Sequence, residues 1–126
     1  TEISNLHVFS SLGVVRYLSL MKYAELVLGN SSSGIIETPA FKIPTVNIGD
    51  RQRGRLRADS IIDCADDEKS IIDAINMAMD NEFRRSCKNI ISPYGDGHAA
   101  EKIAKKIKYT VCNEKIDLKK RFYDLT

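Results

Sequence analysis

Hydrophobic and polar positions along the chain alternate between short apolar runs and segments of helical periodicity. The apolar runs predict strands over residues 5–9, 25–29, 44–48 and 60–64. Two of them, ELVLG and PTVNIG, are continuous rather than alternating. Continuous runs are typical of strands that are buried on both faces of a parallel sheet.

Between these runs, apolar residues three or four positions apart predict helices. Pro39 removes one backbone hydrogen bond from the helix that contains it, so that helix should be short or irregular. Asp66 or Asp67 can cap the start of a later helix. The predicted helices cover residues 14–24, residues 35–41, the stretch from that cap to Met79, residues 81–91 and residues 99–107.

The order of these elements predicts parallel strands joined by helical crossovers, which is an α/β open sheet. Ligands of such sheets bind at the carboxyl ends of the strands. That rule selects two loops as candidate sites, residues 29–34 and residues 49–57.

Composition narrows the class of protein further. The chain has 126 residues, of which 43% are hydrophobic and 29% charged, as expected of one globular domain. A net charge of +2 is too small to argue for a nucleic-acid partner, and no apolar run reaches the roughly 18 residues of a membrane span.

The three cysteines form no C-x-x-C pair, so we expect reduced thiols in a cytoplasmic protein. The chain begins Thr1-Glu2 without Met, and we expect it to be part of a longer protein.

The loop over residues 29–34 combines hydroxyl side chains with the start of a predicted helix. The free N–H groups of a first helical turn favour an anion, and the three serines suit a phosphate. If Gly34 is the N-cap, Glu37 occupies the third helical position, from which its carboxylate can also accept from vicinal hydroxyls. An ordinary loop with Glu37 as a helix cap explains the same residues, and this pattern alone leaves both interpretations open.

An arginine stands at every second position of residues 51–57. If that segment is extended, the four guanidinium groups share one side and form a concentrated anion-binding surface. The alternative is a solvated basic loop. His7 and His98 lack a neighbouring catalytic partner, and the scattered cysteines lack metal-ligand spacing, so we expect no metal site.

Two stretches together resemble a known family: GNSSSGIIETPAFKIPTVNIGDRQRGRLRADSII, and downstream SPYGDGHAAEKIAKKI. They are similar to the C-terminal half of UDP-N-acetylglucosamine 2-epimerases, above all the hydrolysing, sialic-acid-pathway type. The resemblance implies a three-layer Rossmann-like domain with a parallel sheet, the C-terminal half of a GT-B-type two-domain enzyme. Residues 1–112 would then form a partial UDP-binding domain, and residues 113–126 a charged tail.

The resemblance also implies roles for individual residues. Ser31 and Ser32, with the backbone amide of Gly34, match the diphosphate-binding positions, Glu37 matches the carboxylate that binds the ribose hydroxyls, and Arg51 matches an arginine that holds the nucleotide. The family's acid/base carboxylates and its histidine come from earlier segments, so no catalytic residue is expected in this chain. The implied reaction is anti elimination of UDP followed by hydration, which releases N-acetylmannosamine.

The resemblance implies a UDP-sugar substrate, the missing N-terminal domain as an intramolecular partner, a homodimer at full length and no cofactor. Two alternatives remain open from the sequence. One is a related sugar-nucleotide enzyme, such as a UDP-diacetylbacillosamine 2-epimerase or a GT-B glycosyltransferase. The other is an RNA-binding module that uses the arginines of residues 51–57, although no aromatic residues are interleaved with them.

Overall fold

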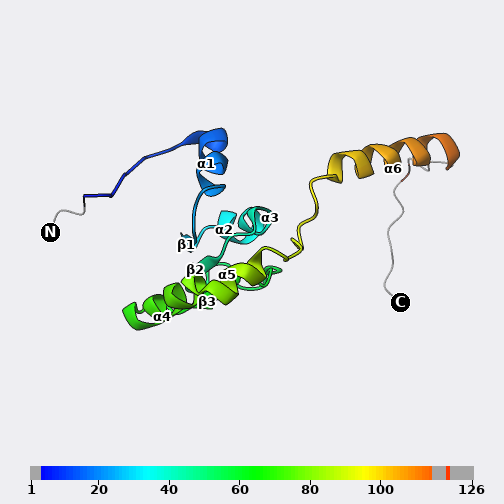
Figure 1. Ribbon diagram of the computed structural model, residues 1–126. Helices are drawn as coiled ribbons and strands as arrows, with labels where there is room; N and C mark the ends of the chain where they lie inside the picture. The colour runs from blue at the N-terminus through cyan, green and yellow to red at the C-terminus, as the bar shows by residue number, and fades with distance from the viewer. Residues whose placement is uncertain (1–3, 115–118, 120–126) are drawn as a thin grey trace. The chain divides into compact units, whose positions relative to one another are not determined.

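The computed structural model describes residues 4–114 and residue 119, and the chain divides into two compact units, Thr1–Tyr94 and Gly95–Thr126 (Figure 1). The first unit contains α1 (Gly13–Met21), β1 (Val27–Gly29), α2 (Ser33–Ile36), α3 (Thr38–Phe41), β2 (Thr45–Ile48), β3 (Ile61–Cys64), α4 (Glu68–Met79) and α5 (Asn81–Cys87). The second contains α6 (Ala99–Asn113).

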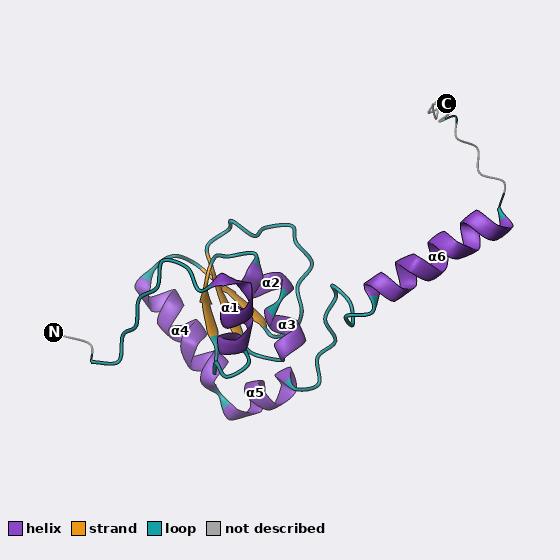
Figure 2. Ribbon diagram, turned by 90° about the horizontal axis from the view of Figure 1, so that it is seen from above, coloured by secondary structure: helices purple, strands orange, loops and turns teal. Residues whose placement is uncertain are grey.

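The first unit is built on a three-stranded parallel sheet in the order β1-β2-β3. In its register, Val46 of β2 lies between Leu28 of β1 and Ile62 of β3. Helices cover both faces of this sheet, as the view from above shows (Figure 2). The prediction of a three-layer α/β domain with parallel strands is confirmed.

Alternating residues of β2 face the two helical layers. Val46 is fully buried and packs in one cluster with Ala74 and Ala78 of α4. Thr45 faces the other way, where its hydroxyl lies 2.7 Å from that of Thr38. A Cβ added to Gly34 would lie only 3.0 Å from Cγ2 of Thr45, so this glycine allows α2 to approach the sheet closely.

Capping residues fix the ends of α4 and α5. The Asp67 carboxylate accepts a hydrogen bond from the Ser70 N–H (2.9 Å), as the predicted cap requires. Asp80 ends α4 and caps α5, accepting from the N–H groups of Glu82 (2.8 Å) and Phe83 (3.0 Å). Hydrogen bonds from the Ser70 side chain and backbone lower the pKa of Asp67 below the ordinary carboxyl value, because they favour the charged form. The N–H groups of Phe83 and Glu82 lower the pKa of Asp80 in the same way.

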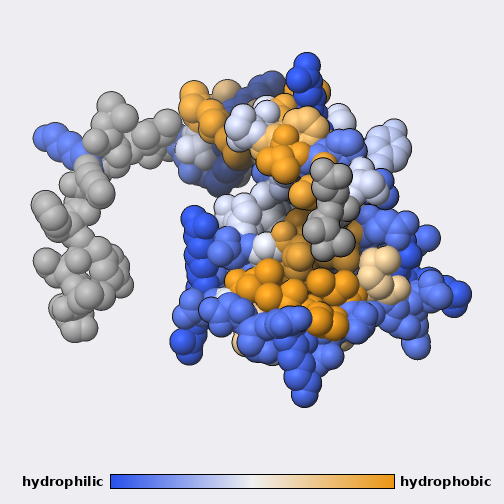
Figure 3. All heavy atoms as spheres, turned by 90° about the vertical axis from the view of Figure 1, so that its left-hand side faces the viewer, coloured by the Kyte–Doolittle hydropathy of each residue, from blue (hydrophilic) through white to orange (hydrophobic). Residues whose placement is uncertain are grey.

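The strand predicted over residues 5–9 is wrong. The described part of this segment has no regular structure, and Leu6, Val8 and Phe9 are exposed. A strand needs a neighbour with which to pair, and no strand of the described residues adjoins this one. Exposed apolar surface is also visible on the face drawn in Figure 3.

Several helix ends differ from their predicted positions. α1 ends at Met21 rather than Ala24, because the N–H groups of Tyr23 and Ala24 bond back only three residues. α5 ends at Cys87 rather than near Ile91, because the next N–H groups, of Lys88 and Asn89, bond back only three residues and tighten the last turn. The helix predicted over residues 35–41 is divided at Glu37 into α2 and α3, with Pro39 in the first turn of α3, which confirms the expected irregular helix.

In the second unit, α6 extends to Asn113, beyond the predicted end at residue 107, and its terminal carbonyl at Tyr109 accepts from the Asn113 side chain (2.9 Å). Asp96 accepts from the His98 N–H (3.1 Å) just before this helix. Most of the predicted tail, residues 113–126, lies outside the described residues. Within the described part of the chain, no helix has both the length and the apolar character that a membrane span requires.

Candidate functional site

The two loops that the sequence selected lie together at the carboxyl edge of the sheet. Gln52, in the loop after β2, donates a hydrogen bond from Nε2 to the carbonyl of Asn30 in the loop after β1 (2.7 Å). The Gln52 side chain is buried, and its Oε1 has no hydrogen-bond partner among the described residues. The sequence analysis did not select this residue. Its position between two arginines just after a strand is the one feature of the sequence that could have indicated it.

The loop after β1 forms hydrogen bonds within itself. The Ser31 hydroxyl accepts from the Ser33 N–H (3.3 Å), and the Gly34 N–H donates to the Ser31 carbonyl (3.1 Å). Ser32 is therefore the N-cap of α2, and the arrangement with Gly34 as N-cap and Glu37 in a capping box is wrong. The amides of Ser31 and Ser32 make no hydrogen bond within the described part of the chain.

Glu37 lies at the joint between α2 and α3 with its carboxylate exposed. The hydroxyl of Ser33, one turn earlier, donates to this carboxylate. The phenol oxygen of Tyr17 in α1 lies 2.6 Å from the same hydroxyl. The three side chains form a continuous hydrogen-bonded row that orients Glu37, and the four-residue spacing from Ser33 to Glu37 is its signal in the sequence.

The arginine segment forms turns and is not extended, so the predicted one-sided row of four guanidinium groups is wrong. The Arg53 N–H donates to the Asp50 carbonyl (2.8 Å), and Gly54 adopts φ 82°, a left-handed conformation that glycine tolerates. The Arg51 side chain is exposed and makes no hydrogen bond or ion pair with the described residues.

Arg57 has a structural role in the same segment. Its Nε lies 2.7 Å from Oδ2 of Asp63 in β3, and its other nitrogens donate to the carbonyls of Arg55 (3.0 Å) and Gln52 (3.2 Å). Asn47 of β2 donates to the second carboxylate oxygen of Asp63 (2.6 Å). This network connects β2 and β3 to the loop that carries Arg51.

The two histidines and the cysteines form no catalytic arrangement among the described residues. His7 lies exposed in the irregular N-terminal segment, and His98 is paired only with exposed Glu101 (3.7 Å). Burial, with smaller contributions from Asp67 and Asp63, raises the pKa of the Cys64 thiol, so this thiol stays protonated at neutral pH. Among the described residues no group of three or more His, Cys, Asp or Glu side chains could hold a metal ion.

Comparison with known proteins shows to which family the chain belongs. The profile of the family described as UDP-N-acetylglucosamine 2-epimerase matches residues 1–108. The chain belongs to this epimerase family. Membership agrees with the resemblance carried by the serine loop and the PYGDG motif.

Three curated relatives are similar to the chain over parts of their length. "Polysialic acid biosynthesis protein P7" from Escherichia coli is 38% identical over 109 residues, 86% of this chain and 28% of that protein. "GDP/UDP-N,N'-diacetylbacillosamine 2-epimerase (hydrolyzing)" from Campylobacter jejuni is 64% identical over 55 residues, which are 44% of this chain and 14% of that protein. "UDP-N-acetylglucosamine 2-epimerase" from Neisseria meningitidis is 40% identical over 70 residues, which are 56% of this chain and 19% of that protein. The matched segments thus span less than a third of these relatives.

Proposed function

We propose that this chain is the UDP-binding part of a hydrolysing UDP-N-acetylglucosamine 2-epimerase. The observation that carries the proposal is the joining of two loops by Gln52, which brings the serine loop and the arginine loop to one sheet edge. Family membership makes a nucleotide diphosphate the ligand that these groups fit.

Each candidate residue has a role that its surroundings support. The exposed hydroxyl of Ser31 and the amides of Ser31 and Ser32 are the donors for the diphosphate. The Gly34 amide is already used by the Ser31 carbonyl, so its contact with phosphate requires that turn to open or the N–H to be shared. The oriented carboxylate of Glu37 accepts from the ribose diol, and the exposed guanidinium of Arg51 binds phosphate oxygens.

In the proposed reaction, the bond between the sugar C1 and the UDP oxygen breaks while a proton leaves C2. Water then adds to the resulting glycal and N-acetylmannosamine is released. This chain stabilises the negative charge that develops on departing UDP, through Arg51 and the serine-loop donors. Proton transfer at C2 belongs to residues outside this chain.

A second candidate function is supported by the local 64% identity to the Campylobacter protein, whose name gives diacetylbacillosamine as the sugar. Both functions use one UDP site and differ at the sugar. Turnover of the two UDP-sugars by a protein that contains this chain and the catalytic segments separates them.

The decisive experiment is calorimetric titration of the 126-residue chain with UDP, uridine and a random RNA oligomer. We expect weak binding of UDP, weaker binding of uridine, and no release of N-acetylmannosamine from UDP-N-acetylglucosamine. Preference for RNA over UDP, or robust sugar release by this chain, would overturn the proposal.

A further inference from the structure

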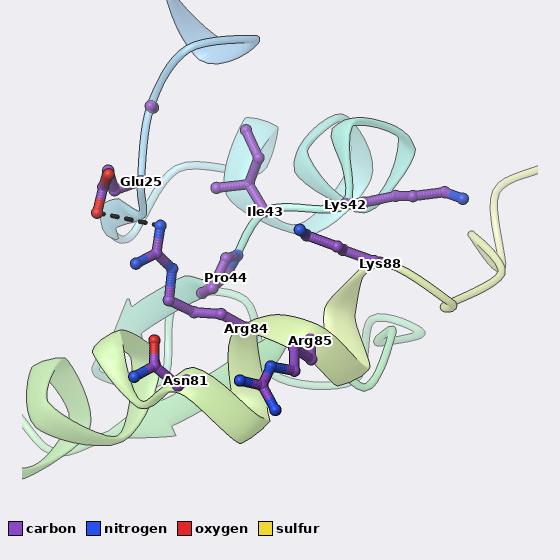
Figure 4. A pocket seen from close by; sticks show the side chains of 9 residues that line it. Glu25, Lys42, Ile43, Pro44, Asn81, Arg84, Arg85 and Lys88 are labelled. Atoms are coloured by element: carbon purple, nitrogen blue, oxygen red, sulfur yellow. Dashed lines mark ion pairs between the residues drawn. The ribbon is translucent and has the colours of Figure 1, made fainter.

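A hollow lies at the amino edge of the sheet, at the opposite end of the strands from the serine and arginine loops (Figure 4). It has a volume of about 390 Å³. Glu25 precedes β1, Pro44 precedes β2, and α5 supplies the remaining wall. We call this feature the amino-edge hollow.

The lining of the amino-edge hollow has a larger net positive charge than the chain as a whole. Its lining has four cations, Lys42, Arg84, Arg85 and Lys88, against the single carboxylate of Glu25. The net charge of the lining is thus +3, whereas the whole chain carries +2, which leaves −1 for all other residues. A concave surface lined by one sign of charge concentrates ions of the opposite sign.

Two of these cations flank an apolar floor. Nη2 of Arg84 lies 3.1 Å from Oε2 of Glu25, which holds the guanidinium in place while about a third of the side chain stays exposed. Figure 4 shows Lys88 pointing toward Ile43, with Arg84 on the far side of that residue. Ile43 is only 6% exposed, so it forms the base of the hollow rather than its rim.

The position of Lys42 is a separate observation. Lys42 ends α3 with φ 59° and ψ 40°, and it is the one non-glycine with positive φ among the described residues. Glycine is the usual residue at such a left-handed helix end, because a Cβ is strained there. In Figure 4 the Lys42 side chain extends away from Ile43 and Arg84, so Lys42 lies at the rim of the hollow and adds positive charge without facing its base. The last-turn position of Arg84 and Arg85 in α5 explains their charge by the helix dipole but does not explain Lys42.

We infer that the amino-edge hollow binds a small polyanion of the phosphate-ester class, independently of the nucleotide loops. Arg84 and Lys88 contact the anion from two sides of Ile43. Lys42 and Arg85 raise the local potential. Glu25 orients Arg84 and opposes the anion, so its charge weakens binding.

The test is titration of the 126-residue chain with inorganic tripolyphosphate, with every variant carrying Arg51→Ala to weaken the other candidate anion site. The double variant Arg84→Gln, Lys88→Gln should lower affinity at least about tenfold, the loss expected for removed charged hydrogen bonds. The double variant Lys105→Gln, Lys108→Gln on α6 is the matched control, since it removes the same charge from two exposed lysines that make no hydrogen bond or ion pair with residues that the structure describes. It should change affinity less than about twofold, the range for screened surface charge.

Glu25→Gln makes the test independent of folding defects, because binding should then strengthen rather than weaken. Amide resonances of Arg84 and Lys88 should shift on titration in the Arg51→Ala protein. Equal losses in the two double variants, weaker binding by Glu25→Gln, or shifts confined to Ser31 and Ser32 would each overturn the inference. Failure of UDP binding alone would leave it standing, since the two sites share no residue.

Discussion

The two loops at the carboxyl edge differ in how the groups that face the ligand are held. In the loop after β1, the same side chains form the loop and face the proposed ligand: Ser31 accepts from Ser33, and Ser33 orients Glu37. In the loop after β2 these tasks are divided, since Gln52 and Arg57 hold the loop and Arg51 remains exposed. Substitutions in the first loop should therefore change binding and stability together, and those in the second should change them separately.

The largest expected effect is that of Arg51→Ala. Because the exposed Arg51 side chain makes no hydrogen bond or ion pair with the described residues, its loss should not change the melting temperature. UDP affinity should fall by about 1.5–3 kcal/mol, the range for a charged hydrogen bond. Calorimetry and thermal melts measure both quantities. Arg53→Ala is the matched control, because Arg53 is also exposed and its backbone rather than its side chain makes the turn. Equal losses in the two variants would indicate a diffuse basic surface.

Gly34→Ala tests whether the close packing of α2 on the sheet supports the loop after β1. The new Cβ would lie 3.0 Å from Cγ2 of Thr45, whose side chain is held by Thr38, so the free energy of unfolding should fall by about 1–3 kcal/mol. Urea denaturation measures this change. UDP affinity should fall as well, because the serine loop leads directly into the displaced helix. Unchanged stability would show that α2 moves freely on the sheet.

Glu37→Ala should distinguish two parts of the ligand. Its carboxylate is proposed to bind the ribose diol, so UDP affinity should fall by about 1–2 kcal/mol while pyrophosphate affinity stays constant. Parallel titrations with the two ligands measure the difference. An equal loss for both ligands would place Glu37 in the phosphate site instead.

Arg57→Ala should have the opposite profile to Arg51→Ala. The contacts of Arg57 with Asp63 and two carbonyls show that it holds the loop. We expect a stability loss of about 1 kcal/mol, limited because both partners are partly exposed, and a smaller loss of UDP affinity. If affinity falls without any loss of stability, the division of tasks in this loop is wrong.

Tyr17→Phe should give the smallest effect. It removes only the phenol oxygen from the row that orients Glu37, so UDP affinity should fall by about 0.5–1.5 kcal/mol, the net value of one hydrogen bond. The loss should disappear with 2′,3′-dideoxy-UDP, which lacks the diol. A similar loss with both ligands would mean that Tyr17 acts on the fold and not on Glu37.

Sequence patterns predicted the parts of the fold whose signals are local. The three strands and the cap at Asp67 follow from apolar runs and a capping residue close in the chain. Of the two continuous runs, only β2 is buried as predicted, since Leu28 of β1 is 48% exposed. The segment 5–9 has the same apolar character but no pairing partner, which a local pattern does not reveal. The role of Arg57 depends on the register that brings Asp63 of β3 beside Asn47 of β2, and sequence spacing carries no information on that pairing.

Glu37 lies between two helices of four residues each, and helices this short have little stability of their own. Ile35 and Thr38, on either side of the joint, are completely buried, and the Thr38 hydroxyl bonds into the sheet at Thr45. The Glu37 carboxylate thus stands on backbone that buried residues fix on both sides. Amide hydrogen exchange over residues 33–41 should consequently proceed only through global unfolding, so ligand affinity and foldedness are lost in one cooperative step.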